Sequence, residues 1–244
     1  MQLNTFPLVL HDSFMITKKV KHFIFKITAD SIFHYIPGQF ITLHFEHEGK
    51  LLKRSYSIAN PPEGNNCIEL AAGYFPGGPG TSLLFNLKPG DSIQASGPYG
   101  RLVLKEHNPK RYVLVATSTG VTPYRAMLTE LGQRMQQQAD LATLIVLGVQ
   151  YQEDLLYHAE FKQFTQQFPQ ATFIPCLSKE NAQALKSGEQ SGYVQQLFPQ
   201  LNLNPEQDFV YLCGNPSMID EAFNYLKAQG FSMDHIVREK YISR

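Results

Sequence analysis

The turn 118–123 has residue types that could bind a ligand. It follows a continuous apolar run, Tyr112–Ala116, and precedes a pattern with helical spacing. Gly120 would let a ligand approach the backbone closely, Thr122 suits a helix N-cap and Pro123 suits a first helical position. A helix N-terminus offers free N–H groups and a positive dipole end, which suit a phosphate. Such a turn also occurs as a plain connection, and the segment alone leaves both interpretations open.

A second strand end, Cys213-Gly214-Asn215-Pro216, repeats this arrangement later in the chain. In open parallel sheets, ligands bind outside the carboxyl ends of the strands. Two such strand ends therefore indicate a nucleotide site more strongly than one. By spacing alone, Cys213 is more simply interpreted as a small buried apolar residue.

The segment Lys53–Ser57 places a cation, an aromatic ring and hydroxyl groups on one predicted strand. Because strand side chains alternate, Arg54 and Tyr56 share a face. A guanidinium group binds phosphate through its fork of donors, and a tyrosine ring can stack on a flat ligand. An exposed strand with ordinary polar side chains would look the same, so this segment does not decide the function by itself.

The composition argues against several classes of protein. Lys+Arg and Asp+Glu both number 21 in the 244 residues, which opposes general binding to nucleic acid. No apolar run approaches the roughly 20 residues of a membrane span, and no secretory pattern opens the chain, so we expect a cytoplasmic protein. The three cysteines, Cys67, Cys176 and Cys213, are too isolated for a disulfide framework, a zinc site or a four-cysteine iron–sulfur site. No metal is expected.

The apolar pattern changes near residue 105. Before it, Ile41–Glu46 alternates strictly between apolar and polar residues, as a half-buried strand requires. Similar short runs without helical patterns predict an antiparallel barrel. These runs are Phe23–Ile27, Ser55–Ile58, Ile68–Ala72 and Asp91–Ala95.

After residue 105, predicted strands alternate with helices, which indicates a parallel sheet with helices on its faces. The last helix should begin at Pro216 and end before Gly230. The predicted fold class is therefore a two-domain β + α/β protein. An antiparallel β-barrel domain covers residues 1–105, a parallel-sheet α/β domain covers residues 106–244, and the hinge lies in Lys105–Lys110. The predicted strands of the second domain are Tyr112–Ala116, Leu144–Val149, Thr172–Leu177, Phe209–Cys213 and His235–Lys240.

Taken in order, these segments resemble the ferredoxin–NADP reductase superfamily. Arg54-Ser55-Tyr56-Ser57 resembles its flavin motif, Arg-x-Tyr-Ser. The resemblance implies that Arg54 binds the FAD pyrophosphate, that Tyr56 packs on the isoalloxazine and that Ser57 hydrogen-bonds near flavin N5. Gly78-Pro79-Gly80-Thr81 is similar to a segment that contacts the flavin phosphates, and Gly97-Pro98-Tyr99-Gly100 to the segment that closes the barrel.

In the second half, Thr119-Gly120-Val121-Thr122-Pro123 resembles the family's nucleotide turn, Gly-Thr-Gly-x-x-Pro, and departs from it at Ser118. Cys213-Gly214-Asn215-Pro216 is similar to Cys-Gly-x-Pro, whose cysteine lies near the nicotinamide. Glu239-Lys240-Tyr241 resembles a carboxyl-terminal Glu-x-Phe/Tyr, whose ring covers the flavin.

The resemblance implies an FAD-binding barrel, an NAD(P)-binding α/β domain and an active site between them. Ser57, Cys213, Glu239 and Tyr241 would be its catalytic residues, positioning the reactants and shaping the electrostatics. The implied cofactor contacts are Arg54, Ser55, Tyr56, Ser57, Ala72, Gly73, Tyr74, Gly78, Gly80, Thr81, Ser82, Thr119, Gly120, Thr122, Pro123, Ser178, Lys179, Tyr193, Cys213, Gly214 and Tyr241.

The implied activity is electron exchange between NADP(H) and a separate ferredoxin or flavodoxin by a monomeric FAD enzyme. FAD suits this activity because it couples a two-electron donor to a one-electron acceptor. Lys179 favours NADPH, whereas the neighbouring carboxylate of Glu180 would favour NADH. The alternatives are an NAD(P)H:flavin oxidoreductase, the reductase component of an oxygenase, and a non-catalytic flavin- or nucleotide-binding subunit.

Overall fold

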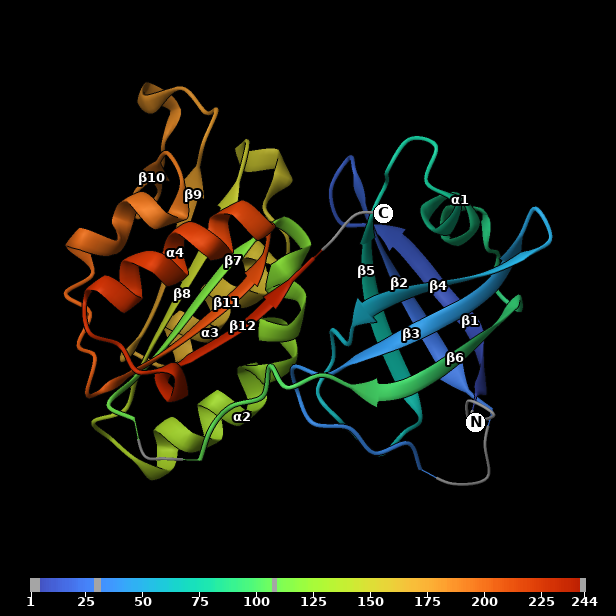
Figure 1. The fold of residues 1–244 in the computed structure, drawn as a ribbon, viewed down its shortest axis with the longest axis horizontal. Helices are drawn as coiled ribbons and strands as arrows, with labels where there is room; N and C mark the ends of the chain where they lie inside the picture. The colour runs from blue at the N-terminus through green and yellow to red at the C-terminus, as the bar shows by residue number, and fades with distance from the viewer. Residues whose placement is uncertain (1–4, 29–31, 107–108, 242–244) are drawn as a thin grey trace. The chain divides into compact units, whose positions relative to one another are not determined.

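The structure is a computed structural model that describes residues 5–28, 32–106 and 109–241. The chain forms two compact units. The first consists mainly of residues up to Leu104, and the second consists mainly of residues from Lys105 onward. Figure 1 labels their helices and strands.

The first unit is a six-stranded antiparallel sheet with the strand order β4-β3-β6-β1-β2-β5. An antiparallel bridge pairs Ile58, the residue directly after the edge strand β4, with Leu70 of the other edge strand, β5, and closes the sheet into a barrel. The predicted antiparallel barrel is thus confirmed. Its strands are β1 (Phe6–Met15), β2 (Val20–Ile27), β3 (Phe40–His47), β4 (Lys50–Ser57), β5 (Cys67–Gly73) and β6 (Ser92–Tyr99).

Alternating apolar side chains fill the barrel, as the period of two in its strands requires. The first strand, β1, was not predicted from the sequence. Its apolar period is interrupted between Leu10 and Asp12, where the pairing of β1 with β2 is irregular. The core side chains include Leu8, Leu10, Phe23, Phe25, Ile41 and Leu43, each at most 1% exposed.

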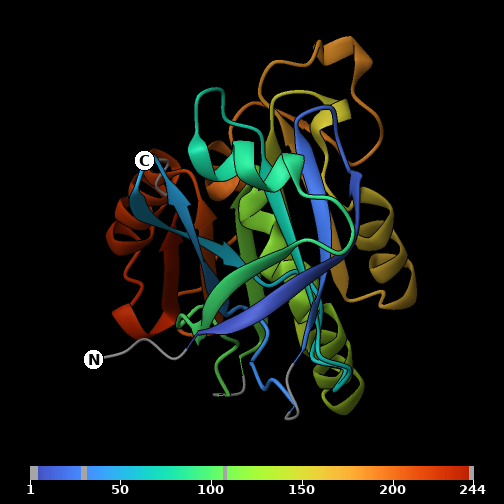
Figure 2. The same ribbon diagram turned by 90° about the vertical axis from the view of Figure 1, so that its right-hand side faces the viewer.

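One helix, α1 (Pro79–Asn86), lies in this unit, where the sequence predicted only strands. The sequence showed no helical pattern in this half of the chain, because the eight residues of α1 form only about two turns and show no clear helical period. Pro79 occupies the start of the helix, where its missing N–H costs nothing. Leu84 is buried in the barrel core, and such packing stabilises a helix too short to form alone. In both views α1 lies across one end of the barrel strands (Figures 1 and 2).

The second unit is a six-stranded parallel sheet with the order β10-β9-β8-β7-β11-β12. The strand order reverses between β7 and β11, which makes their carboxyl ends the switch point where open α/β sheets bind ligands. The strands are β7 (Arg111–Thr117), β8 (Ala142–Val149), β9 (Ala171–Leu177), β10 (Gln190–Ser191), β11 (Asp208–Gly214) and β12 (Ile236–Lys240). The helices are α2 (Thr122–Gln137), α3 (His158–Gln167) and α4 (Pro216–Ala228), and the 3-10 segments include η1 (Ser118–Val121), η2 (Gln152–Asp154) and η4 (Val194–Gln200).

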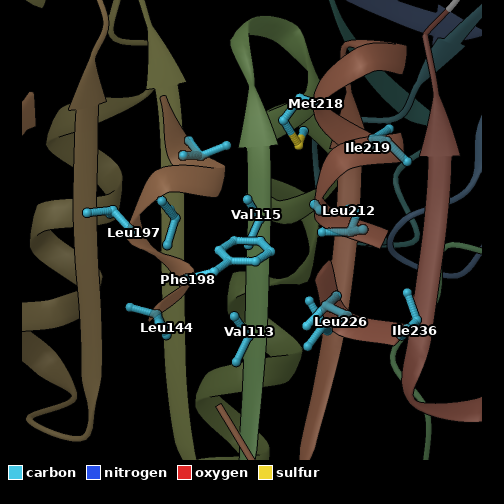
Figure 3. Packing of buried hydrophobic residues seen from close by; sticks show 14 of the residues in the cluster. Val113, Val115, Leu144, Leu197, Phe198, Leu212, Met218, Ile219, Leu226 and Ile236 are labelled. Carbon is cyan, nitrogen blue, oxygen red and sulfur yellow. The ribbon is translucent and has the colours of Figure 1, made fainter. Parts of the chain in front are cut away.

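Buried apolar side chains hold helices to this sheet. Figure 3 shows side chains of α4 and η4 packed on one face of β7, β8 and β11. Every residue of β7 from Tyr112 to Ala116 is at most 1% exposed, so both of its faces are covered. This explains the continuous apolar run in the sequence.

Two helix starts differ in how well the sequence predicted them. The helix α4 begins at Pro216, with Asn215 Oδ1 accepting the N–H groups of Ser217 and Met218, and it ends before Gly230 as predicted. For α2, the N-cap is Val121 and Thr122 is the first helical residue, so the predicted N-cap at Thr122 was wrong by one position. The 3-10 turn η1 moves the start, because it continues the backbone directly into α2.

No helix among the residues that the structure describes combines the length and the apolar character that a membrane span needs.

Candidate functional site

Arg54 and Tyr56 lie on β4 beside the first turn of α1. A Cβ atom built on Gly80 would lie 2.9 Å from Arg54 Cγ and 3.6 Å from Tyr56 Oη, so a side chain there would meet Arg54. The first turn of α1 contains no acidic residue, and its N-cap, Gly78, makes no side-chain cap. A positive helix end therefore lies beside a guanidinium group, and the two together suit a phosphate. We call Arg54, Tyr56, Gly78 and Gly80 the β4–α1 cradle.

The side chains of the cradle are in states that suit a flavin nucleotide. Arg54 Nη1 donates to the backbone oxygen of Lys53 at 2.8 Å, and among the residues that the structure describes its remaining N–H groups have no recorded acceptor, so they can donate to a phosphate. Burial raises the pKa of Tyr56 to about 12, against the opposing charge of Arg54, so the phenol stays neutral at physiological pH. Its ring also packs against the barrel core, which fixes a flat apolar surface for stacking.

The hydroxyl groups predicted to contact the flavin, those of Ser55, Ser57 and Thr81, do not all lie on the Arg54 face of β4. Ser55 and Ser57 lie on the other side of β4 from Arg54, because side chains alternate along the strand. Ser55 Oγ lies 3.0 Å from Thr42 Oγ1, while Ser57 is buried. Thr81 Oγ1 donates to the Phe75 backbone oxygen at 3.0 Å, so this hydroxyl stabilises the turn before α1.

The turn between β5 and α1 brings the remaining predicted flavin residues to one place. Ala72 and Gly73 end β5, and the exposed Tyr74 follows them. The Tyr74 ring meets Phe85 of α1 edge-on, with the ring centroids 5.2 Å apart. Ala72–Tyr74 therefore lies beside the helix that carries Gly80, Thr81 and Ser82.

In the second unit, two glycines, Gly120 and Gly214, allow the carboxyl ends of β7 and β11 to approach each other closely. A Cβ on Gly120 would lie 2.4 Å from the Cys213 backbone oxygen, and a Cβ on Gly214 would lie 2.4 Å from Thr117 Oγ1. Gly214 also has a φ of +121°, which L side chains rarely adopt. The hydroxyl of Thr117 accepts the Asn215 N–H at 2.8 Å. The sequence prediction did not include Thr117, although its place directly after the predicted strand Tyr112–Ala116 was a usable signal.

The nucleotide turn contains two features that bear on the fit of a ligand. Ser118 has a φ of 49°, in the left-handed region where glycine carries no steric cost, which explains why the related motif has glycine there. Thr122 Oγ1 is buried and has no hydrogen-bond partner within the described structure. Because a buried hydroxyl normally has a hydrogen-bond partner, the Thr122 hydroxyl at this helix start can act as a donor to a bound nucleotide.

Cys213, Glu239 and Tyr241 converge at the ends of β11 and β12. Cys213 is paired with Glu239 in the register of the two strands, and the Tyr241 N–H donates to the Gly214 backbone oxygen at 2.8 Å. Burial raises the pKa of the Cys213 thiol well above its usual value, the charge of Glu239 raises it further, and a hydrogen bond with the Tyr241 side chain opposes them. The thiol is therefore neutral and a poor nucleophile, as expected for a positioning group.

Ser178, Lys179 and Tyr193 follow the carboxyl ends of β9 and β10, and we call them the β9–β10 edge. Ser191 pairs with Leu177, and the Gly192 N–H donates to the Leu177 oxygen at 3.1 Å. Ser178 is thus the first residue beyond β9, and Tyr193 is the second residue beyond the paired strand β10. Lys179 is exposed, as is the Tyr193 side chain, at 58%.

The chain was compared with known proteins. The model of the oxidoreductase FAD-binding domain family matches residues 7–104, and the model of the oxidoreductase NAD-binding domain family matches residues 114–223. A ferredoxin–NADP reductase B of Sorangium cellulosum is 28% identical over 91% of this chain and 91% of its own length. The toluate 1,2-dioxygenase electron transfer component of Pseudomonas putida is 28% identical over 85% of this chain, which spans 59% of that protein.

Solved structures share the fold. A ferredoxin NADP+ reductase from Neisseria gonorrhoeae with bound FAD and NADP superposes with a TM-score of 0.83 at 22% identity, over 98% of this chain and 99% of that one. The two family models, the full-length reductase relative and this shared fold agree with the geometry of the cradle and of the strand ends. The chain therefore belongs to the ferredoxin–NADP reductase superfamily and is an FAD- and NAD(P)-binding oxidoreductase.

Proposed function

We propose that this enzyme exchanges electrons between NADP(H) and a separate one-electron carrier, a ferredoxin or a flavodoxin. We assign FAD to residues 1–105 and the nicotinamide nucleotide to residues 106–244. The observation that carries the proposal is the convergence of Cys213, Glu239 and Tyr241 at the ends of β11 and β12. The full-length similarity to ferredoxin–NADP reductases supports it, as does a cysteine count of three, too few to bind a four-cysteine cluster in the chain itself.

The residues of the cradle would hold FAD, which when bound couples two-electron and one-electron transfer. Arg54 and the free end of α1 would bind the pyrophosphate, and Tyr56 would pack on the isoalloxazine. Ser57 would donate a hydrogen bond near flavin N5. None of these groups has to act as a nucleophile, because their task is to bind and orient the reactants.

The residues at the ends of β7, β11 and β12 would receive the nucleotide. Gly120 and Gly214 leave the backbone accessible there, and the neutral thiol of Cys213 can lie against a nicotinamide without repelling it. Glu239 supplies a carboxylate beside the thiol that can hold a proton or relay it.

Anaerobic stopped-flow mixing with NADPH and NADH in separate experiments tests this function. We expect the flavin absorbance to bleach with either nucleotide, and reoxidation to follow when oxidised ferredoxin or flavodoxin is added. Reduction of ferricyanide without reoxidation by either carrier would remove the proposed partner class while leaving the flavoenzyme assignment intact.

A second candidate function, the reductase component of an oxygenase, is supported by the similarity to the toluate 1,2-dioxygenase component. It predicts electron transfer to an oxygenase iron–sulfur protein. An NAD(P)H:flavin oxidoreductase would release FAD on gel filtration, whereas the proposed enzyme keeps it. A non-catalytic subunit would oxidise neither nucleotide with any acceptor.

Tyr241→Ser tests the proposal that the Tyr241 ring covers the flavin. Removing an aromatic ring from a stacked pair should shift the flavin absorbance bands, and it should strengthen NADP(H) binding because the ring competes with the nicotinamide. Absorbance spectra and a nucleotide titration measure both effects. Tyr241→Phe serves as the control and should resemble the wild type. An unchanged spectrum together with an unchanged affinity would show that Tyr241 does not lie on the flavin.

Lys179→Glu tests the preference for NADPH. The exposed ammonium group can meet a 2′-phosphate as a point charge, so reversing its sign should lower the ratio of kcat/KM for NADPH to that for NADH by about tenfold or more. Both nucleotides are assayed with ferricyanide as acceptor. A ratio equal to that of the wild type would remove Lys179 from the nucleotide site.

A further inference from the structure

We propose that Asp220 and Phe223 of α4 are positioning residues that hold the end of β12 closed and so limit how readily Tyr241 makes way for the nicotinamide. The inference rests on the proposed function, in which the Tyr241 ring covers the flavin. It adds the motion by which the ring leaves, because the end of β12 separates from β11 and contacts with α4 oppose this opening. We call Asp220 and Phe223, with their partners Arg238 and Lys240 on β12, the α4–β12 clamp.

The side chains of β12 divide between two faces of the sheet. Ile236 packs in the core cluster together with side chains of α4 (Figure 3). Because strand side chains alternate, Arg238 and Lys240 share this face with it. Glu239 and Tyr241 share the opposite face for the same reason. One face of the strand therefore holds it to α4, and the other carries the residues assigned to the active site.

Two contacts of different kinds make up the clamp. Lys240 Nζ lies 2.6 Å from Asp220 Oδ1 and 2.7 Å from its Oδ2, which is an ion pair. The guanidinium carbon of Arg238 lies 3.8 Å from the centroid of the Phe223 ring, which is a cation–π contact. Asp220 and Phe223 are three residues apart on α4 and so lie on one face of the helix. Both contacts therefore act together on the last three residues of the strand.

The end of β12 is held less firmly than its start. The strand lies at the edge of the sheet and pairs with β11. Its first residue, Ile236, is 6% exposed, whereas the side chains of Lys240 and Asp220 are 36% and 52% exposed. An exposed ion pair contributes little to stability, and it can separate without exposing the core. An opening that begins at the end of β12 therefore costs less free energy than one that begins at Ile236.

Opening of this strand end carries Tyr241 with it. The Tyr241 N–H donates to the Gly214 oxygen at 2.8 Å, directly beyond the last register pair of the two strands, Gly214 with Lys240. The Tyr241 side chain also forms a hydrogen bond with the Cys213 thiol. Backbone and ring are thus both held at the end of β11. The alternative motion, rotation of the ring alone, would leave the backbone hydrogen bond to Gly214 intact.

The experiment measures the opening and the nucleotide affinity in the same FAD-loaded protein. Hydrogen exchange of the Tyr241 amide, followed by NMR, reports the opening of the strand end, and a titration with NADP+ gives the dissociation constant. Asp220→Asn keeps the shape and removes the charge, and Phe223→Leu removes the ring and keeps an apolar side chain. Each should speed the exchange about two- to fivefold, and the double variant about tenfold. Because the nucleotide binds the open state, its dissociation constant should fall by the same factor.

Two further variants keep this result specific. Glu221→Gln makes the same kind of charge change one residue along α4, where the carboxylate accepts from Gln195 Nε2 at 2.7 Å, and it should change neither the exchange nor the affinity. The charge-swapped variant, Asp220→Lys with Lys240→Asp, restores an ion pair and should return both quantities to within about twofold of the wild type.

Two results would overturn the inference. Faster exchange with an unchanged affinity for NADP+ would show that the ring leaves by rotation alone. Unchanged exchange in the double variant would show that α4 does not restrain the strand end. In either case, bleaching of the flavin absorbance by NADPH leaves the proposed function intact. A protein that neither nucleotide bleaches would instead contradict the proposed function, whatever the exchange rates.

Discussion

Arg54→Ala is expected to weaken the FAD complex by roughly ten- to hundredfold. The substitution removes a charge-assisted contact to the pyrophosphate, of a kind worth about 1.5–3 kcal/mol. The helix end beside it cannot compensate, because Gly78 and Gly80 have no side chains to add donors. Flavin retained after gel filtration, followed by fluorescence titration of the apoprotein with FAD, measures the loss.

The matched control is Lys50→Ala, which removes a cation from the first residue of the same strand, β4, and should keep its flavin. Tyr56→Ala should also lose FAD, because it removes the stacking surface. Full retention of FAD by both Arg54→Ala and Tyr56→Ala would contradict the assignment of the cradle.

Asp208→Ala should lower the stability of the second unit by about 3–5 kcal/mol, because it leaves a partly buried cation without its partner. Asp208 is 3% exposed, and its Oδ1 and Oδ2 accept from Arg111 Nε and Nη2 at 3.1 and 2.5 Å. Its Oδ2 also accepts the Asn204 N–H at 2.8 Å, so the substitution leaves this donor unpaired too. Thermal unfolding followed by circular dichroism should show a fall in Tm of about 10 °C.

Asp140→Ala is the control for this prediction. Asp140 also forms an ion pair at the amino ends of the sheet, with Lys110, but both side chains are more than half exposed. Solvent screens such a pair, so its loss should leave the thermal transition almost unchanged. Equal effects of the two substitutions would show that burial does not govern the contribution of Asp208.

In the second unit, the residues that stabilise the fold and the residues that would bind the nucleotide lie at opposite ends of the same strands. Asp208 and Arg111 begin β11 and β7, whereas Cys213, Gly214 and Thr117 end the same strands. Asp208→Ala should therefore destabilise the fold without altering nucleotide preference in the fraction that remains folded.

The sequence by itself determined the fold class and the order of the motifs, because both follow from local rules. Strict alternation in Ile41–Glu46 and the continuous apolar run Tyr112–Ala116 report how many faces of a strand are covered. Pro216 and Gly230 mark helix ends through backbone geometry that belongs to those residue types. The flavin and nucleotide motifs were identified by their resemblance to the ferredoxin–NADP reductase superfamily, which also depends only on the order of residues along the chain.

Only the tertiary structure decided how separate segments fit together. The helix α1 forms because Leu84 enters the barrel core, and this contact cannot be predicted from the eight residues of the helix alone. Gly120 and Gly214 are needed because a Cβ at either position would meet the neighbouring strand end, and Cys213 is neutral because its surroundings exclude water. Gln152 donates from its backbone N–H to Glu180 Oε2 at 3.1 Å and from its side chain to Glu189 Oε2 at 2.7 Å, so hydrogen bonds also join residues from different turns. These features are steric fit, burial and hydrogen bonding between residues that are distant in the sequence. They depend on the packed structure, so the local periodicity of the sequence does not predict them.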